Sequence, residues 1–174
     1  MGLAPTASTT ATLALGDALA VALLDAKGFG AEDFARSHPG GNLGRRLLTH
    51  VRDIMHTGTG IPSVRNDALL SEALLEITRK RLGMTAIVND AQRVLGIFTD
   101  GDLRRTLEKR LDFTTTRVSE VMSHNPRDIG PDALAAEAVQ IMEQYNINQM
   151  LVVDEDNKLV GALNMHDLLR AKVI

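Results

Sequence analysis

The chain has 174 residues, of which 44% are hydrophobic and 24% charged, and its formal net charge is −3. This balance is ordinary for a globular domain, and a slightly acidic chain offers no basic field for nucleic acid or for an anionic membrane surface. The chain has no cysteine or tryptophan, which excludes disulfides, thiolate metal sites and a cysteine nucleophile, and its few aromatic rings disfavour single-stranded nucleic acid as a ligand. We therefore expect small molecules or proteins as partners.

The N-terminal segment predicts an apolar helix over residues 13–24. Hydroxyl side chains before it can cap its start, and Lys27 and Gly28 end the pattern. Apolar positions occupy most of its circumference, so we expect another part of a protein to cover it. The stretch 11–26 contains Asp17, is too short to cross a bilayer and follows no basic residues, so we expect a cytosolic location and no membrane contact.

A second short helix is predicted over residues 29–37. The segment 38–44 that follows has the sequence His-Pro-Gly-Gly-Asn-Leu-Gly, which cannot form a regular helix or strand. The edge of a domain is therefore expected near residues 45–50.

From residue 51 onward the chain repeats the same pattern, and at a spacing of 65 residues ten positions of 67–105 are identical to their counterparts in 132–170. Each copy predicts a short helical turn, a strand, a helix, a hairpin of two apolar strands and a final helix, which is an α/β (α+β) arrangement. Paired small units of this kind usually enclose a cleft that binds a ligand. The predicted elements are turns at 51–55 and 118–122, strands ending at Val64 and Ile129, helices capped by Asp67 and Asp132 that reach Lys80 and Tyr145, hairpins at 84–98 and 150–163, and helices beginning at Asp100 and Met165.

Polar side chains follow the last strand of each copy, Thr99 and Asp102 in the first and Asn164 and Asp167 in the second. A hydroxyl at a strand-to-helix turn lies beside free helix amides that favour phosphate, and a carboxylate one turn in can accept both hydroxyls of a ribose. Helix capping alone explains the same residue types. Because an amide replaces the hydroxyl in the second copy, one occupied ligand site per pair is the preferred expectation.

A duplicated β-α-β-β-α unit with these strand ends resembles a pair of CBS domains, a regulatory tandem also called a Bateman module. In CBS pairs that bind adenylates, a Thr or Ser at the strand end and an Asp three residues on hold phosphate and ribose. The resemblance marks Thr99 and Asp102 as ligand-binding residues and, less strongly, Asn164 and Asp167. Arg104 and Arg105 follow Asp102 on the same helix, and one of them could reach a ligand phosphate or an acidic group on a neighbouring subunit. The resemblance also implies self-association as a CBS dimer, through the helices at 69–80 and 133–145.

The residues before the repeat narrow the resemblance. Leu3-Ala-Pro-Thr-Ala-Ser, Phe34-Ala-Arg-Ser-His38-Pro-Gly-Gly and Val51-Arg-Asp-Ile-Met-His56 together resemble the junction of a sugar isomerase domain with a CBS pair in D-arabinose 5-phosphate isomerases. That family interconverts D-ribulose 5-phosphate and D-arabinose 5-phosphate for Kdo and lipopolysaccharide synthesis, and a homotetrameric parent is implied. The implied domains are 1–48, a remnant of the isomerase domain with its linker, 49–112, CBS domain 1, and 113–174, CBS domain 2.

His38 matches an active-site histidine of that family, but a proton-transfer group without its substrate pocket is no catalyst, so we expect no isomerase activity from this chain alone. The other histidines have no metal-ligand spacing, and no required cofactor is expected. Two hypotheses follow. In the first, the chain is a regulatory module that binds a nucleotide, either AMP or ATP or the nucleotide sugar CMP-Kdo. In the second, it is a structural dimerisation module that binds no ligand.

Overall fold

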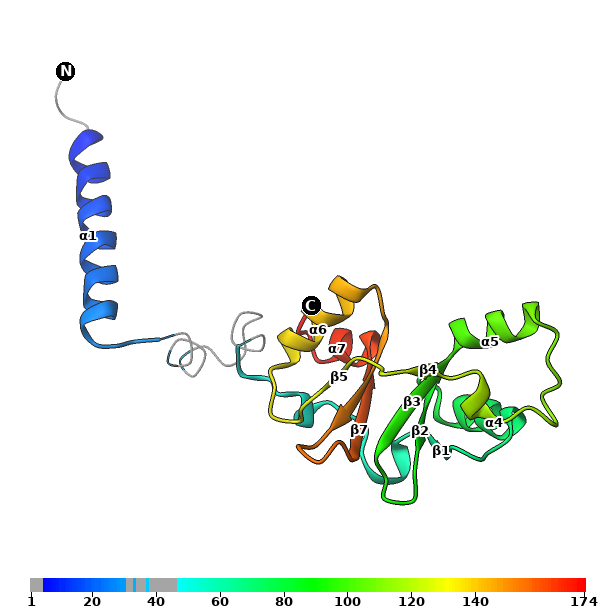
Figure 1. The fold of residues 1–174 in the computed structure, drawn as a ribbon. Coiled ribbons are helices and arrows are strands. Elements are labelled where there is room, and N and C mark those ends of the chain that lie inside the picture. Colours follow the sequence, from blue (N-terminus) through cyan, green and yellow to red (C-terminus); the bar gives the residue numbers. More distant parts are fainter. Residues whose placement is uncertain (1–4, 31–32, 34–36, 38–46) are drawn as a thin grey trace.

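The structure is a computed structural model that describes residues 5–30, 33, 37 and 47–174. It consists of an N-terminal helix, α1 (Ala7–Ala26), and two α/β units that lie side by side (Figure 1). The duplication predicted from the sequence is therefore confirmed as two units of similar build.

The first unit contains a four-stranded sheet and two long helices, and the second a three-stranded sheet and two helices. In the first sheet the strand order is β1-β2-β3-β4, with β1 parallel to β2 and the other pairs antiparallel. The elements of the first unit are β1 (Ser63–Arg65), α4 (Leu70–Lys80), β2 (Met84–Val88), β3 (Val94–Thr99), α5 (Asp100–Glu108) and β4 (Ser123–His124). Those of the second are β5 (Asp128–Ile129), α6 (Ala135–Tyr145), β6 (Gln149–Val153), β7 (Leu159–Asn164) and α7 (Met165–Arg170).

The two hairpins repeat each other down to their register. Met84 pairs with Thr99 in the first, and Gln149 pairs with Asn164 in the second. Both hairpins also shift register at the same place, one residue before the end of β2 and of β6. The strand and helix boundaries predicted for these hairpins agree with the structure to within one residue.

The predicted helix caps are wrong. The N-cap residues are Leu69 and Leu134, not Asp67 and Asp132. Asp67 instead pairs with the guanidinium of Arg65, and Asp132 pairs with Arg52. At the start of α4 the free amide of Leu69 is satisfied by the side chain of Glu72 at 2.8 Å, so a carboxylate inside the first turn replaces the expected cap.

The two units exchange their first segments, which the linear repeat does not indicate. The turn Val118–Glu120 and strand β4 belong by sequence to the second copy, but Val118 packs in the core of the first unit with Leu70 and Phe98. Conversely, Val51 packs in the core of the second unit, and the backbone of His56 forms an isolated antiparallel β-bridge with Ala162 of β7. The sequence limits at 48/49 and 112/113 stay a prediction, but each unit is completed in space by a segment of the other copy.

This exchange makes a testable prediction for Val118→Ala. Val118 is fully buried, so its truncation is expected to lower the free energy of unfolding by about 2 kcal/mol. Amide hydrogen exchange should accelerate in α4 and β3 of the first unit. Faster exchange confined to α6 and α7, the helices of the copy to which Val118 belongs by sequence, would contradict the exchange.

The two sheets pack face to face through one apolar cluster. β2 and β3 contribute the larger part of it, and Leu151 and Ala162 come from β6 and β7. The hairpin loops also pair with each other, because Val94 donates to the carbonyl of Asn157 at 3.1 Å. The packing of the two sheets in this shared core therefore fixes the position of one unit relative to the other.

Helix α1 has no buried residue and lies apart from the other described elements (Figure 1). Its leucines and valine are exposed on every side, for example Leu13 at 66% and Val21 at 65%. The helix begins earlier than predicted, and its 20 residues are long and apolar enough to cross a membrane by length and composition alone, which corrects the expectation that the stretch is too short. Core helices of soluble proteins share this composition, so the helix by itself does not indicate a membrane location.

Candidate ligand-binding site

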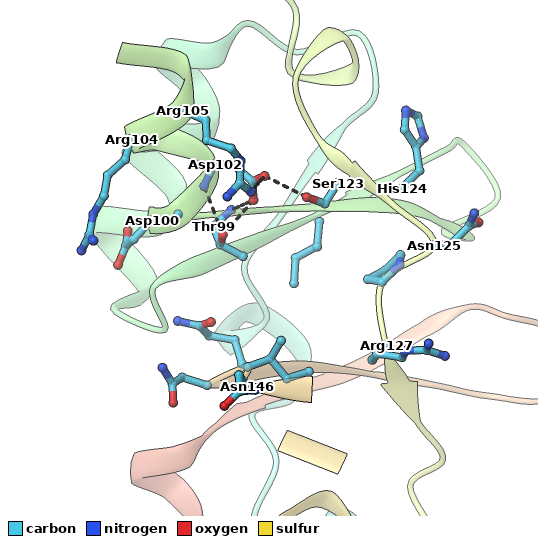
Figure 2. A pocket seen from close by; sticks show the side chains of 16 residues that line it. Thr99, Asp100, Asp102, Arg104, Arg105, Ser123, His124, Asn125, Arg127 and Asn146 are labelled. Carbon is cyan, nitrogen blue, oxygen red and sulfur yellow. Dashed lines mark hydrogen bonds and ion pairs between the residues drawn. The ribbon is translucent and has the colours of Figure 1, made fainter. Parts of the chain in front are cut away.

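A cavity of ≈ 560 Å³ lies where three segments of the two units meet. Figure 2 shows the start of α5 on one side, the segment from Ser123 to Arg127 on another, and the turn between α6 and β6 below. The cavity is lined by Ile97, Thr99, Asp100, Gly101, Asp102, Arg104, Arg105, Ser123, His124, Asn125, Pro126, Arg127, Asn146, Ile147, Asn148 and Gln149. The structure therefore brings three of the predicted ligand-binding residues, Thr99, Asp102 and Arg104, to one cavity between the units.

Thr99 and Asp102 form a reciprocal pair at the N-terminus of α5. The hydroxyl of Thr99 donates to Oδ2 of Asp102 at 2.7 Å, and its backbone amide donates to the same oxygen at 2.9 Å. The amide of Asp102 donates back to the Thr99 hydroxyl at 3.4 Å. Helix capping thus accounts for part of this arrangement, as the residue types alone indicate.

The other carboxylate oxygen of Asp102 joins two further segments. Oδ1 accepts from the Ser123 hydroxyl at 2.8 Å and from Nη2 of Arg105 at 2.6 Å. Burial favours the neutral acid, but the hydrogen bonds from Thr99, Ser123 and Arg105 outweigh it and lower the pKa of the Asp102 carboxyl below its ordinary value. Asp102 is therefore a buried, ionised carboxylate at the wall of a cavity.

Three arginines line the cavity in different states. Arg105 is held by Asp102, and the guanidinium of Arg127 lies 4.2 Å from the ring centroid of Tyr145, a cation–π contact. Arg104 forms no hydrogen bond or ion pair with any of the residues that the structure describes, and its side chain is exposed. It is the cation best placed to meet an anionic group of a ligand without first breaking a contact.

The rest of the lining is apolar on one part and amide-rich on another. Its apolar side chains are Ile97, Pro126 and Ile147. Its four amide side chains are Asn125, Asn146, Asn148 and Gln149. Gly83 borders this region, because a Cβ there would lie 3.0 Å from Nε2 of Gln149 and 3.2 Å from Oδ2 of Asp100. Its φ of +70° also favours glycine, so both the limited space and the backbone conformation favour glycine at position 83.

The second pair of predicted ligand residues lies outside this cavity. Asn164 and Asp167 cap α7 in the same reciprocal way, with N–H···O distances of 2.9 and 3.1 Å. Oδ1 of Asp167, however, contacts Nε2 of His56 at 3.1 Å. His56 follows Met55 as Ser123 follows Met122, so an imidazole stands where the first unit has a small hydroxyl.

The surroundings of Asp167 are also less polar than those of Asp102. At the repeat spacing of 65 residues, Met165 stands for Asp100, Leu169 for Arg104 and Met84 for Gln149. An acid, a cation and an amide of the cavity thus have apolar counterparts. The sequence preference for one site over the other rested on Asn164, but these three positions and His56 mark a larger difference.

His38 lies outside the described residues. His124 lines the cavity, and its ring points away from Thr99 and Asp102 in Figure 2. Within the described part of the chain, no three His, Cys, Asp or Glu side chains form a group that could hold a metal ion. Sequence reasoning did not select Ser123, because only the segment exchange brings it to Asp102.

Comparison with protein-family models gives one match, the CBS domain, over residues 51–109 and 118–174. These two stretches coincide with the two copies of the repeat.

Curated relatives match over the entire chain. The chain is 56% identical over 174 residues to arabinose 5-phosphate isomerase KdsD of Yersinia pestis, 55% identical to that of Pseudomonas aeruginosa and 56% identical to that of Escherichia coli K12. In each case the match spans 53% of the relative, so the chain spans about half the length of the curated relatives it matches.

Solved structures match the paired units. Hypoxic Response Protein I, described with two coordinated zinc ions, is 27% identical with a TM-score of 0.62, over 70% of this chain and 98% of that one. The CBS domain pair of protein MJ0100, in complex with 5-methylthioadenosine and S-adenosyl-L-methionine, is 23% identical with a TM-score of 0.63, over 70% of this chain and 94% of that one. CBSX2 in complex with AMP is 23% identical with a TM-score of 0.61, over 71% of this chain and 95% of that one. The last two likenesses concern the fold alone.

Proposed function

Since the chain belongs to the CBS domain family, we propose that it is the nucleotide-binding regulatory pair of an arabinose 5-phosphate isomerase, and that one nucleotide binds in the cavity beside α5. The observation that carries the proposal is the ionised, buried carboxylate of Asp102 at the cavity wall, next to Thr99 and the N-terminus of α5. This combination offers an acceptor for hydroxyls and donors for phosphate within one helical turn.

Each part of a nucleotide has complementary groups in the cavity. Asp102 accepts a ribose hydroxyl, the hydroxyl of Thr99 holds the Asp102 carboxylate in place, and the backbone amide of Gly101 in the first turn of α5 donates to the phosphate. Arg104 adds the charge that a phosphate needs. The base lies among Ile97, Pro126 and Ile147, whose apolar side chains can cover its faces.

The identity of the base is the finer part of the proposal. Solved CBS pairs of the same fold are described with AMP and with S-adenosyl-L-methionine, which supports an adenosine ligand. The four amides of the cavity equally suit the hydroxyl groups of a nucleotide sugar, and CMP-Kdo would report the end product of the pathway that arabinose 5-phosphate enters. AMP, ATP and CMP-Kdo are therefore the ligands to test.

The whole protein is proposed as a D-arabinose 5-phosphate isomerase that supplies Kdo and lipopolysaccharide synthesis in the cytosol, without a required cofactor. The 56% identity to isomerases that are nearly twice as long supports this proposal. Residues 1–48 would then belong to the isomerase domain, where His38 would take part in proton transfer. The uncovered apolar surface of α1 supports this assignment, because a helix without a polar face needs a partner.

Thermal unfolding with AMP, ATP, CMP and CMP-Kdo tests the nucleotide site. A ligand present at about 100 times its dissociation constant is expected to add about 2.7 kcal/mol to the free energy of unfolding. The shift should saturate with one ligand per chain. An unchanged midpoint with all four ligands, or a stoichiometry of two, would overturn the site as proposed.

The second candidate function is a dimerisation module that binds no ligand. Exposed apolar side chains on the outer helices favour self-association, among them Leu75 of α4 at 57% and Tyr145 of α6 at 42%. Sedimentation of Leu75→Glu separates the two functions. Loss of the dimer with unchanged nucleotide binding would show that the two properties are independent, and a dimer without any nucleotide response would favour the second function.

A further inference from the structure

The carboxylate of Asp102 has no unused position for a ribose. A carboxylate accepts about four hydrogen bonds, and Asp102 already accepts four, two from Thr99, one from Ser123 and one from Arg105. A ribose hydroxyl can therefore bind only if one donor of the chain leaves. The question is which of these contacts gives way.

Thr99 and Ser123 are held by secondary structure. Thr99 is the last residue of β3 and the N-cap of α5, and one of its two contacts comes from the backbone amide. Ser123 lies on β4, where it pairs with Ile97 of β3. Both residues stay beside Asp102 as long as β3 and β4 stay paired, and the backbone amide of Thr99 cannot turn away from Oδ2.

Arg105 is held only through its side chain. It reaches Oδ1 of Asp102 from one turn further along α5, and 61% of its side chain is exposed, against 4% for Asp102. Water and salt compete for the exposed guanidinium, and Asp102 keeps its hydrogen bonds from Thr99 and Ser123 when that guanidinium leaves. The guanidinium can therefore leave Asp102 by rotation about its own side-chain bonds, into a cavity that it already lines.

On the basis of the nucleotide site proposed above, we propose that Arg105 is a displaceable side chain that occupies the ribose position of Asp102 in the empty site and moves to the phosphate of the bound nucleotide. The residue thus acts twice, as a competitor of the ribose and as a partner of the phosphate. A ligand with a phosphate compensates for the broken ion pair, whereas a nucleoside does not. Arg105 would therefore make the site select nucleotides over nucleosides.

The second unit provides an internal comparison. Arg170 is the counterpart of Arg105 at the repeat spacing, but Oδ1 of Asp167 contacts His56. No contact between Arg170 and Asp167 occurs among the described residues, and neither lines the cavity. Arg170 is thus a matched control for a change of charge at the same position of the fold.

The proposal predicts effects of opposite sign for two kinds of ligand. In Arg105→Ala the affinity for adenosine or cytidine should rise about threefold, because the competing guanidinium is gone. The affinity for AMP or CMP should fall about tenfold, because the phosphate loses a charge-assisted partner. Arg105→Gln keeps a long polar side chain without the charge and should give the same pattern. It replaces the alanine variant in the test if that variant folds poorly.

The experiment is calorimetric titration of each variant with both nucleoside–nucleotide pairs. Circular dichroism first shows that the variant unfolds as the wild type does. Arg104→Ala should weaken the nucleotide without improving the nucleoside, and Arg170→Ala should change neither. Equal losses for nucleoside and nucleotide in Arg105→Ala and Arg105→Gln would overturn the displacement and leave a structural role for Arg105. If the wild-type chain binds neither pair, the nucleotide site itself is overturned, whatever the variants do.

Discussion

Asp102→Asn is expected to lose nucleotide binding by about 100-fold and to lower the free energy of unfolding at pH 7 by about 2–3 kcal/mol. An asparagine keeps the shape, but its amide nitrogen cannot accept, so the donors that meet at one carboxylate oxygen lose their acceptor. Ser123 and Arg105 share Oδ1, and both contacts of Thr99 end on Oδ2, so either orientation of the amide leaves two donors unsatisfied. Calorimetry and chemical denaturation measure the two effects separately.

The loss of stability should depend on pH with a definite sign. The folded state lowers the pKa of Asp102, since the hydrogen bonds outweigh burial, so the ionised carboxylate stabilises the fold above the pKa of the unfolded chain. This contribution disappears as the pH falls through the lower, folded pKa. The wild type and Asp102→Asn should therefore differ most near neutrality and converge in strong acid. A difference that grows on acidification would contradict the sign of the shift.

Asp167→Asn is the matched control for the binding effect. Asp167 caps α7 as Asp102 caps α5, and it has its own partner in His56, but it does not line the cavity. The variant should lose stability and keep its nucleotide affinity. If both asparagine variants lose the ligand to the same extent, the site is not confined to the cavity beside α5.

Gly96→Ala is expected to lower the free energy of unfolding by about 1–3 kcal/mol and to weaken ligand binding as well. A Cβ at this position would lie 2.6 Å from the sulfur of Met122 and 2.9 Å from the carbonyl oxygen of Ser123. Met122 can rotate, but the carbonyl belongs to β4, which pairs with β3 at this residue. The added methyl group must push β4 outward. The Ser123 hydroxyl, which donates a hydrogen bond to Asp102, moves with the strand.

Gly130→Ala serves as the control, because no atom lies within 4 Å of a Cβ there. That variant should retain both stability and affinity. Gly161 repeats the crowding in the second unit, where an added Cβ would meet Met55 and the carbonyl oxygen of His56. Gly161→Ala should therefore destabilise without changing the ligand affinity. Native stability in Gly96→Ala would mean that β4 has more freedom than the pairing indicates.

Local patterns in the sequence were sufficient for the hairpins and for the ends of β3 and β7. Alternation and apolar runs locate strands to within one residue, and the start of α5 follows from the capping chemistry of Thr99 and Asp102. The same reasoning failed at Asp67 and Asp132, because two acids lie near the start of each helix, Asp67 with Glu72 and Asp132 with Glu137. Which acid caps a helix depends on the partners of the others, and Arg52 and Arg65 are such partners.

What the sequence by itself determined is the duplication, the two β-α-β-β-α units and the pairing of a hydroxyl with a carboxylate at the end of β3. These features depend on contacts between residues close in the chain, so periodicity and spacing reveal them. Only the tertiary structure decided that β4 joins the first sheet, that Ser123 and Arg105 saturate Asp102, and that His56 takes the equivalent place at Asp167. Ser123 and His56 lie 21 and 111 residues from the acids that they contact, and no local pattern specifies which distant side chain fills a position next to a buried charge. The exchange of segments between two packed sheets brings them there, and it makes two nearly identical motifs chemically different.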